Sequence, residues 1–380
     1  MEASSERTTS AMEGNHDRIS ELPDPSLVHI LSAMATKLAI SPAVTLDFTG
    51  EFARRQTPDE LVASINRHLQ LYTGHKIRGF RVSLHPAKLY QEHLDRWVQF
   101  AATRLVEELD LNFSPPAEEM GYYYPDDDGN SKPKYEIPTC LYSSGSLTHL
   151  SLSFCDLCSP WVFSNFGLLQ SLSLRGVNFD DATLGRVLSG CPLLEMLSLR
   201  QCSHLNSVDI TSPTTRLKRL VLVDCEFSDD FDVVRISAPS VESFHFFGDI
   251  YCIDFSLAGA PSLSDAFICY INRECTEPEH DYVKLLSELA HVRILTVCKA
   301  TLMCVTILEE YYMEEDDLPL QLESLQELKL LMPIMDAEYL SYIYGFLRLF
   351  PSPFLEKLFI RLPKVLEDPT RPYQVPNTRS

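Results

Sequence analysis

The sequence predicts an α/β solenoid, in which a curved parallel sheet lies on the concave side and short helices or loops lie on the convex side. Three observations support this fold class. Short apolar phrases recur at a regular spacing, each phrase alternates apolar with other residues, and the segments between phrases have helical periodicity. In the central part, the first apolar residue of each phrase advances by 22, 25, 23, 24 and 22 residues. These residues are Leu150, Leu172, Leu197, Leu220, Phe244 and Ala266.

The recurring phrase has the form L-x-L, and its period is that of leucine-rich repeats. Alternate side chains of a strand face opposite ways, so Leu150 and Leu152 are expected to point into the solenoid and Ser151 to point out. One repeat cannot cover its own leucines, and stacking on its neighbours buries a continuous apolar column. Outside the centre the steps lengthen to about thirty residues. Clear copies occupy 146–157, 168–179, 193–205 and 216–227, and weaker ones occupy 76–85, 105–114, 240–250, 262–271, 291–300, 324–334 and 354–364.

The segments between phrases are predicted to be short convex-side helices. In DDATLGRVLSGCP (180–192), Leu184, Val187 and Leu188 fall on one helical face. Such a face packs onto the apolar side of the strands and closes each repeat.

Three cysteines occupy one position of the repeat. Cys155, Cys202 and Cys225 each lie three residues after the second leucine, where leucine-rich repeats place Asn or Cys to satisfy backbone groups. Cys155 and Cys158 also spell C-x-x-C, but a zinc site needs a second pair with suitable spacing. Buried structural thiols are therefore favoured over a metal site or chance, and we expect neither a metal nor a cofactor.

Composition excludes several classes of partner. The chain has 380 residues, and 32 basic against 53 acidic residues give a formal net charge of −21. A protein this acidic is repelled by phosphate backbones and anionic lipid surfaces, so we expect no nucleic acid and no membrane as partner. The first twenty residues are polar and no apolar run suits a membrane helix, so no secretory signal is expected. The eleven cysteines then indicate free thiols in the cytosol or nucleus.

Signatures of catalysis were sought in the sequence. It contains no phosphate-binding G-x-x-x-x-G-K, no H-E-x-x-H and no G-x-S-x-G, and its eleven histidines are scattered. A non-enzymatic protein is therefore favoured, and an enzyme is the less favoured alternative.

The outward positions of the central strands predict a partner-binding concave face, because repeat arrays bind partners there. Arg175 and Arg200 are expected on adjacent strands, where they form a basic spot able to bind a carboxylate or phosphate. The alternative is that these arginines pair with neighbouring Asp and Glu. The predicted contact residues are Ser151, Ser173, Arg175, Ser198, Arg200, Arg219, His245 and Phe247.

An amphipathic helix precedes the repeats, in DRISELPDPSLVHILSAMATK (17–37). Asp24 can cap a helix that begins at Pro25, the position that proline tolerates best. Leu27, Ile30, Leu31 and Met34 then form one apolar stripe. From the pattern alone, this helix covers the exposed end of the solenoid core.

The same stretch closely resembles the first half of an F-box, as found in the large plant family of F-box proteins with leucine-rich repeats. SGCPLLEMLSLRQC and SAPSVESFHFFG resemble repeats of that family, and VTLDF (44–48) resembles the strand that usually follows its F-box. The resemblance covers about residues 17–48 and 140–365.

The resemblance implies a function. In that family the F-box docks onto a Skp-type adaptor of a cullin-RING ubiquitin ligase, and the repeats hold the protein to be ubiquitinated. Matched residue by residue, the apolar adaptor-facing positions are Leu22, Pro23, Leu27, Ile30 and Leu31.

The chain departs from the family pattern after this helix. Thr36 and Lys37 are followed almost at once by LAISPAVTLDF, whereas the family continues with a second helical half rich in Arg and Trp. Roughly twenty expected residues are absent, and the remaining helix offers only part of the apolar surface that a stable interface buries. The rival interpretation is therefore a leucine-rich-repeat scaffold that binds a partner and no longer engages the ligase.

The predicted organisation has four segments and one long insertion. Residues 114–138 are rich in Pro, Gly and acidic residues and predict a surface loop. The segments are a disordered N-terminus at 1–16, a partial F-box helix at 17–41, the solenoid at 42–365 and a flexible tail at 366–380.

Overall fold

A computed structural model of the chain describes most of the predicted solenoid. The predicted F-box helix, both terminal segments and Cys158 lie outside the described residues. The described ranges are 44–116, 133–157, 165–211, 215–225, 233–248, 254–257, 259–270, 282–312 and 321–362.

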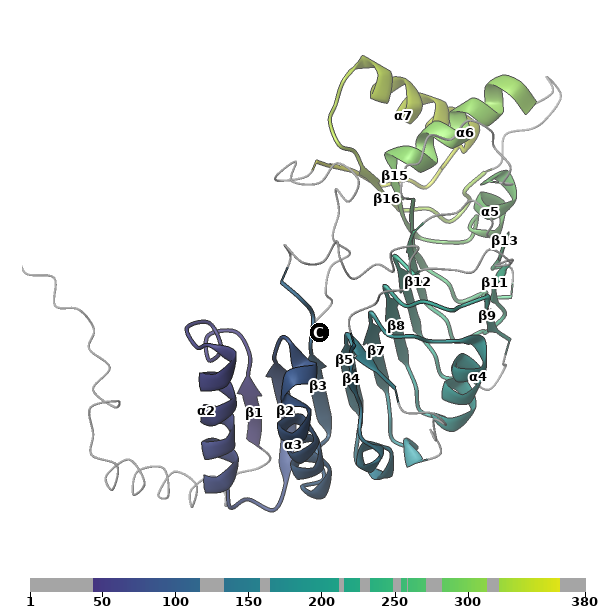
Figure 1. The fold of residues 1–380 in the computed structure, drawn as a ribbon. Coiled ribbons are helices and arrows are strands. Elements are labelled where there is room, and N and C mark those ends of the chain that lie inside the picture. Colours follow the sequence, from purple (N-terminus) through teal and green to yellow (C-terminus); the bar gives the residue numbers. More distant parts are fainter. Residues whose placement is uncertain are drawn as a thin grey trace, which may run out of the picture.

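The predicted curved parallel sheet is confirmed. In the described ranges, twelve strands lie side by side in chain order, and each pairs in parallel with the next (Figure 1). The strands are β1 (Val44–Phe48), β2 (Ile77–Ser83), β3 (Glu108–Asn112), β5 (His149–Ser153), β7 (Ser171–Arg175), β8 (Met196–Arg200), β10 (Arg219–Val223), β12 (Ser243–Gly248), β14 (Asp265–Tyr270), β15 (Ile294–Cys298), β16 (Glu327–Leu331) and β17 (Lys357–Arg361).

The leucine column predicted from the repeat spacing forms the core of the sheet. Leu150, Leu172 and Leu197 are direct partners on neighbouring strands, and the register continues through Leu220 and Phe244 to Ala266. All six side chains are buried, with at most 3% of their surface exposed. Each repeat therefore covers the apolar side chains of the one before it, as the period required.

The convex side differs in part from the prediction. The expected helix is present as α4 (Asp181–Gly190), which is capped by the Asp180 carboxylate accepting from the Thr183 N–H at 2.8 Å. In the next repeats, however, short strands replace helices and form a second parallel sheet, because SVDI and VVRI alternate apolar with polar residues. This sheet contains β9 (Ser207–Ile210), β11 (Val233–Ile236) and β13 (Asp254–Ser256).

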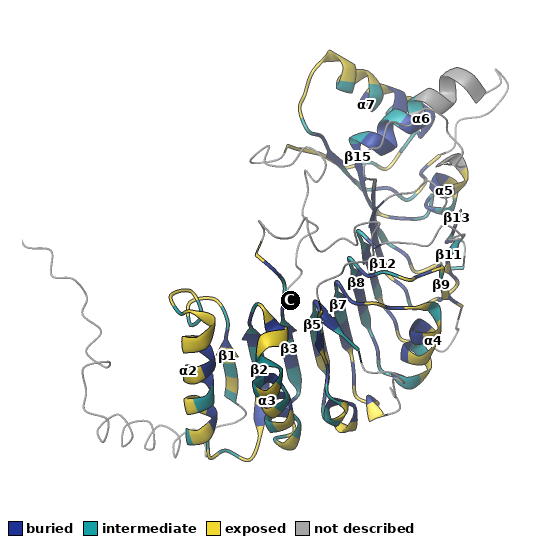
Figure 2. Ribbon diagram, in the orientation of Figure 1, coloured by how far each residue is buried: buried dark blue, intermediate teal, exposed yellow. Residues whose placement is uncertain are grey.

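Full helices explain why the repeats lengthen toward both ends. In α2 (Pro58–Leu71), Thr57 and Glu60 form a capping box, and α3 (Gln91–Thr103) buries Trp97 against the sheet. Both helices have a buried and an exposed face (Figure 2). Within the described ranges, no helix has both the length and the apolar character needed to cross a membrane. The other helices are α5 (Tyr282–Glu288), α6 (Lys299–Tyr312) and α7 (Ala337–Leu349), with single 3-10 turns at Ala87–Tyr90 and Thr139–Ser143.

The predicted surface loop at 114–138 ends earlier than expected. Tyr135 is fully buried in the short strand β4 (Tyr135–Glu136), which pairs with β6 (Cys155–Asp156). Its hydroxyl donates to the Asp95 carboxylate at 2.9 Å, and its ring packs edge-on against Phe113. The buried position of Tyr135 could not be predicted from the acidic, proline-rich composition of the segment. Residues 117–132 of the predicted loop lie outside the described ranges.

The repeat cysteines belong to the scaffold, as predicted. Cys155, Cys202 and Cys225 are buried free thiols. The Sγ of Cys202 lies 3.5 Å from the Arg200 carbonyl, and the Sγ of Cys225 lies 3.5 Å from the Leu199 carbonyl, so both thiols donate to the backbone. Burial raises the pKa of the Cys155 thiol well above its usual range. Cys155 is therefore held as a neutral, unreactive thiol.

Replacing Leu197 with Ala should lower the free energy of unfolding by about 2–5 kcal/mol, because the side chain is fully buried between two neighbouring repeats. Leu358→Ala is the matched control. It removes the same side chain from the same column, but Leu358 is 43% exposed on the last strand of the sheet. The Leu358→Ala variant should therefore lose less than half as much free energy of unfolding as Leu197→Ala. Urea unfolding followed by circular dichroism measures both, and equal losses would contradict the stacked-column account.

Candidate functional site

The outward side chains of the sheet form rows that run across the strands on the concave side. In the middle row, Ser151, Ser173 and Ser198 are adjacent, since the three strands pair in direct register. The row is charged toward its start and hydroxyl-bearing in the centre, and beyond the centre it is mainly apolar or aromatic, with Thr296 and Lys329 as polar members. From β1 to β17 it consists of Asp47, Arg81, Asp110, Ser151, Ser173, Ser198, Val221, His245, Phe267, Thr296, Lys329 and Phe359.

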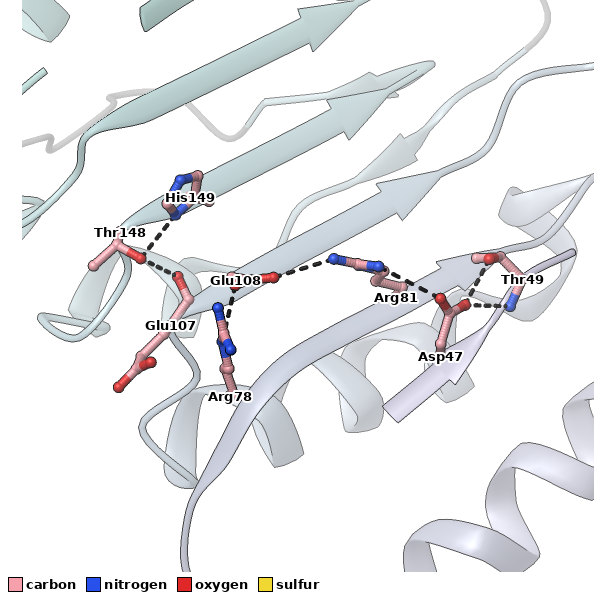
Figure 3. Close-up of polar contacts among 8 residues, drawn as sticks. All are labelled: Asp47, Thr49, Arg78, Arg81, Glu107, Glu108, Thr148 and His149. Atoms are coloured by element: carbon pink, nitrogen blue, oxygen red, sulfur yellow. Dashed lines mark hydrogen bonds and ion pairs between the residues drawn. The ribbon is translucent and has the colours of Figure 1, made fainter. Parts of the chain in front are cut away.

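At the N-terminal end, the outward arginines are neutralised by carboxylates from neighbouring strands (Figure 3). Arg81 on β2 lies 3.1 Å from the Glu108 carboxylate on β3 and 3.6 Å from the Asp47 carboxylate on β1. Arg78 donates to the other oxygen of Glu108 at 3.1 Å. Each pair is partly solvated and contributes little stability alone. Their effect is to leave this end of the face electrically balanced.

The centre of the face carries small hydroxyl side chains. Ser151, Ser153 and Ser173 are half-buried, whereas Ser171 and Ser198 are buried. Because serine is short, the backbone of β5, β7 and β8 is less covered here than at the arginine-rich end. The predicted serine contacts therefore lie side by side, and their role in binding stays a prediction.

The predicted basic spot has the expected geometry. Arg175 and Arg200 are direct partners on β7 and β8. Arg175 Nε donates to the Gln201 side-chain oxygen at 2.9 Å, and its guanidinium lies 5.6 Å from the Phe154 ring centroid. Arg200 Nε donates to the Ser198 hydroxyl at 3.3 Å. In the part of the chain that the structure describes, no carboxylate forms an ion pair with Arg200, so the alternative of acidic pairing does not hold for this residue.

The pKa of Arg200 is affected by its burial and by the arginines on the two neighbouring strands. Its pKa is held below the usual range, first by burial and then by repulsion from the nearby charges of Arg175 and Arg219. Arg219 lies on β10, the strand next to β8, level with Met196 and two outward rows before Arg200. The charges of Arg175 and Arg219 thus act on Arg200 from the two adjacent strands.

His245 and Phe247 occupy outward positions of β12, but the expectation that they are exposed is wrong. They are only 8% and 6% exposed, and Phe267 on the next strand is 7% exposed. The His245 ring lies 5.5 Å from that of Phe267, and its Nε2 donates to the Asp265 carboxylate at 3.0 Å. Large side chains on neighbouring strands shield one another, which a single strand pattern does not reveal.

Sequence reasoning missed two charged residues of this face. Lys134 lies in the predicted loop, yet its Nζ donates to the Gly176 carbonyl at 3.0 Å, directly after Arg175. Asp265 also accepts from the Ser243 hydroxyl at 3.0 Å. Aligning the outward positions of the weaker repeats would have found Asp265, whereas nothing in the repeat pattern pointed to Lys134.

The fold and its outward rows define a leucine-rich-repeat protein with a concave sheet face. The family model described as "At1g61320/AtMIF1, LRR domain" matches residues 69–369, more than half of the chain. The chain therefore belongs to this family of leucine-rich-repeat proteins.

Relatives from Arabidopsis thaliana carry F-box names. The F-box protein At5g03100 is 30% identical over 237 residues, which are 60% of this chain and 69% of that protein. F-box/LRR-repeat protein 25 is 33% identical over 236 residues, 59% of this chain and 83% of that protein. F-box/LRR-repeat protein At3g03360 is 29% identical over 305 residues, 74% of this chain and 59% of that protein. The resemblance to plant F-box proteins with leucine-rich repeats is thus confirmed.

Asp265→Asn should destabilise the fold at neutral pH but not in acid. Burial alone would raise the pKa of Asp265, yet hydrogen bonds from His245 and Ser243 and the His245 charge hold it below its usual range. Because the pKa of Asp265 is lower in the folded protein than in the unfolded chain, where it is about 3.9, the ionised carboxylate stabilises the fold above that pH. This stabilisation is lost as the pH falls through the lower pKa of the folded protein. The thermal unfolding temperatures of the unmutated protein and of Asp265→Asn, measured from neutral pH to about pH 3, give the difference in stability. A difference that stays constant over this pH range would contradict the prediction.

Proposed function

We propose that the chain is the substrate-recognition subunit of a Skp/cullin/RING ubiquitin ligase and binds its target through the leucine-rich repeats. The single observation that carries the proposal is a continuous concave sheet face, with a polar and basic centre, in a chain whose relatives are named F-box proteins. Its place of action is the cytoplasm, the nucleus or both.

The dimensions of the face suit a protein partner. Neighbouring strands lie about 4.8 Å apart, so a sheet of twelve strands extends for about 50 Å. Specific protein interfaces bury on the order of 800 Å² on each side, which a surface of that length accommodates. An extended segment of the target can lie across several strands and contact one outward side chain from each.

The role is proposed to be non-enzymatic. The outward rows bring Ser243, His245 and Asp265 together, but the serine hydroxyl and the histidine both donate to the aspartate. An activated serine requires the hydroxyl to donate to the histidine instead. The arrangement thus supports a structural role for this cluster.

Adaptor binding is assigned to residues 17–37, for which the sequence predicts a helix. Leu22, Pro23, Leu27, Ile30 and Leu31 lie outside the described residues, so their assignment rests on the resemblance of residues 17–37 to an F-box. The names of the relatives support an F-box-type role but do not identify an adaptor or a substrate.

The purified chain should capture a Skp-type adaptor, and Leu27→Asp should abolish the capture by placing a charge in the centre of the apolar stripe. Arg200→Gln is the matched control, because it alters the concave face and leaves the stripe intact. Co-purification of the adaptor with each variant is the measurement. If the unmutated chain fails to retain the adaptor, the ligase role is refuted for this chain.

The second candidate is a scaffold that binds the same target and delivers it nowhere. It is favoured by the missing second half of the F-box after Lys37. Grafting a complete F-box in place of residues 17–41 distinguishes the two. Adaptor capture only by the grafted chain assigns the scaffold role, whereas equal capture by both chains assigns the ligase role.

A further inference from the structure

The described part of the sheet ends in a strand whose far edge is open. Strand β17 (Lys357–Arg361) pairs with β16 on one side, and no described strand lies on its other side. All of its residues are exposed, whereas β8 and β10 in the middle of the sheet are largely buried. The open edge of β17 therefore differs from the concave face, because it offers unpaired backbone as well as side chains.

The backbone of β17 has unpaired groups at alternate residues. The Lys357 N–H donates to the Gln326 carbonyl at 3.0 Å, so the backbone of Lys357 is turned toward β16. Backbone groups alternate in direction along a parallel ladder, and Leu358 and Ile360 therefore direct their N–H and C=O groups to the open side. A further strand can pair with these two residues without disturbing the pairing with β16.

The same two residues leave the apolar column uncovered. Leu358 and Ile360 continue the column of Leu328 and Leu330 on β16, yet they are 43% and 41% exposed. Repeat arrays normally need a terminal repeat with a polar outer face. Here β17 and its flanks carry further exposed apolar side chains, which are Phe354, Phe359 and Leu362. Exposed apolar groups gathered beside an unpaired strand indicate an interaction site.

A cation marks the start of the open edge. Lys357 lies 3.8 Å from the Glu327 carboxylate on β16, and the same carboxylate lies 2.7 Å from Lys329. The Lys357 side chain is 59% exposed, so this shared contact holds it weakly. Lys357 faces the outward side of the sheet, whereas Leu358 and Ile360 face the inward side.

Strand β16 shows which kind of strand β17 accepts. It places Leu328 and Leu330 beside the apolar residues of β17 and Glu327 opposite Lys357. Because the side chains of a strand are shared by its two edges, a strand on the open side meets the same requirements. It needs apolar residues at alternate positions and acidic residues between them.

A second copy of the chain does not meet these requirements. A twofold axis would pair two β17 strands antiparallel, and a pair centred on Phe359 places Lys357 opposite Arg361 of the other copy. Like charges directly opposite each other destabilise a strand pair. A net charge of −21 also makes two copies repel each other. The open edge therefore favours a different chain.

We propose that the open edge of β17 binds an extended segment of another protein, which adds to the sheet as a further strand. Its alternate apolar side chains extend the column beyond Leu358 and Ile360, and an acidic side chain between them pairs with Lys357. Such strand addition takes its affinity from main-chain hydrogen bonds and its selectivity from alternate side chains. The inference is independent of the proposed function, because it uses neither the concave face nor residues 17–37.

The test measures fluorescence anisotropy of the full chain with three labelled pools of short peptides. The first pool alternates Val, Leu or Ile with Glu or Thr. The second pool has the same composition in shuffled order, and the third has Lys in place of Glu. The first pool should bind at least about tenfold more tightly than either other pool, because only its peptides satisfy the backbone, the column and Lys357 together.

Ile360→Pro should abolish this binding, because proline removes an N–H that points to the open side and that β16 does not use. Lys357→Glu keeps the backbone edge intact and should transfer the preference from the first pool to the Lys pool. Lys218→Glu is the matched control. It reverses the charge of an exposed lysine that also contacts a carboxylate of the neighbouring repeat, Glu195 at 2.9 Å, and it should leave the preference unchanged.

Several results would overturn the proposal. They are equal affinity for the ordered and shuffled pools, unchanged binding by folded Ile360→Pro, and an unchanged preference in Lys357→Glu. If Ile360→Pro does not fold, the charge reversal at Lys357 decides.

The other possible occupants of the edge are tested on the full chain alone. A dimer detected by light scattering and dissociated by Ile360→Pro would assign the edge to a second copy and overturn the proposal. Slow hydrogen exchange of the Leu358 and Ile360 amides in the free monomer would show that the chain itself covers the edge, which also overturns it. We expect a monomer in which both amides exchange fast and become protected only when the first pool is added.

Discussion

The structure depends on one constraint, which is that no repeat can bury its own apolar strand residues. Leu172 and Leu197 are covered only because the next strand pairs in direct register and places another apolar side chain over them. The constraint acts between nearest neighbours, so stability accumulates along the array. It also explains why the last strand differs from the others, since Leu358 and Ile360 remain 43% and 41% exposed where no further strand in the described part of the chain covers them.

The same constraint leaves the outward rows free to carry function. Inward positions are restricted to Leu, Ile, Phe, Val and Ala, whereas the outward position of the middle row changes from Arg81 through Ser173 to Phe267. Direct register places these side chains one strand spacing apart, so the order of repeats in the sequence is the order of chemical groups on the face. A balanced ion-pair network, a hydroxyl and guanidinium centre and a shielded aromatic segment follow one another along a single surface.

The sequence was sufficient for the sheet, because a period of 22 to 25 residues with an L-x-L core determines strand order, direction and register together. It also placed Arg175 beside Arg200. It was insufficient where a contact depends on a segment outside the repeat. Tyr135 and Lys134 lie in a stretch whose composition indicates a loop, and each is fixed by a contact with another element. The burial of His245 was missed because shielding depends on side chains of the neighbouring strand β14.

The two arginine environments show how one scaffold separates stability from binding. At the N-terminal end, Arg81 lies between carboxylates of two neighbouring strands, so its charge is used within the protein. At the centre, Arg200 lies beside Arg175 of the neighbouring strand, and its Nε donates to the Ser198 hydroxyl at 3.3 Å. The strand β8 has fully paired neighbours on both sides, so Arg200 is held on a well-supported part of the sheet. The stacking that holds the array together therefore also fixes Arg175 and Arg200 beside each other in its middle.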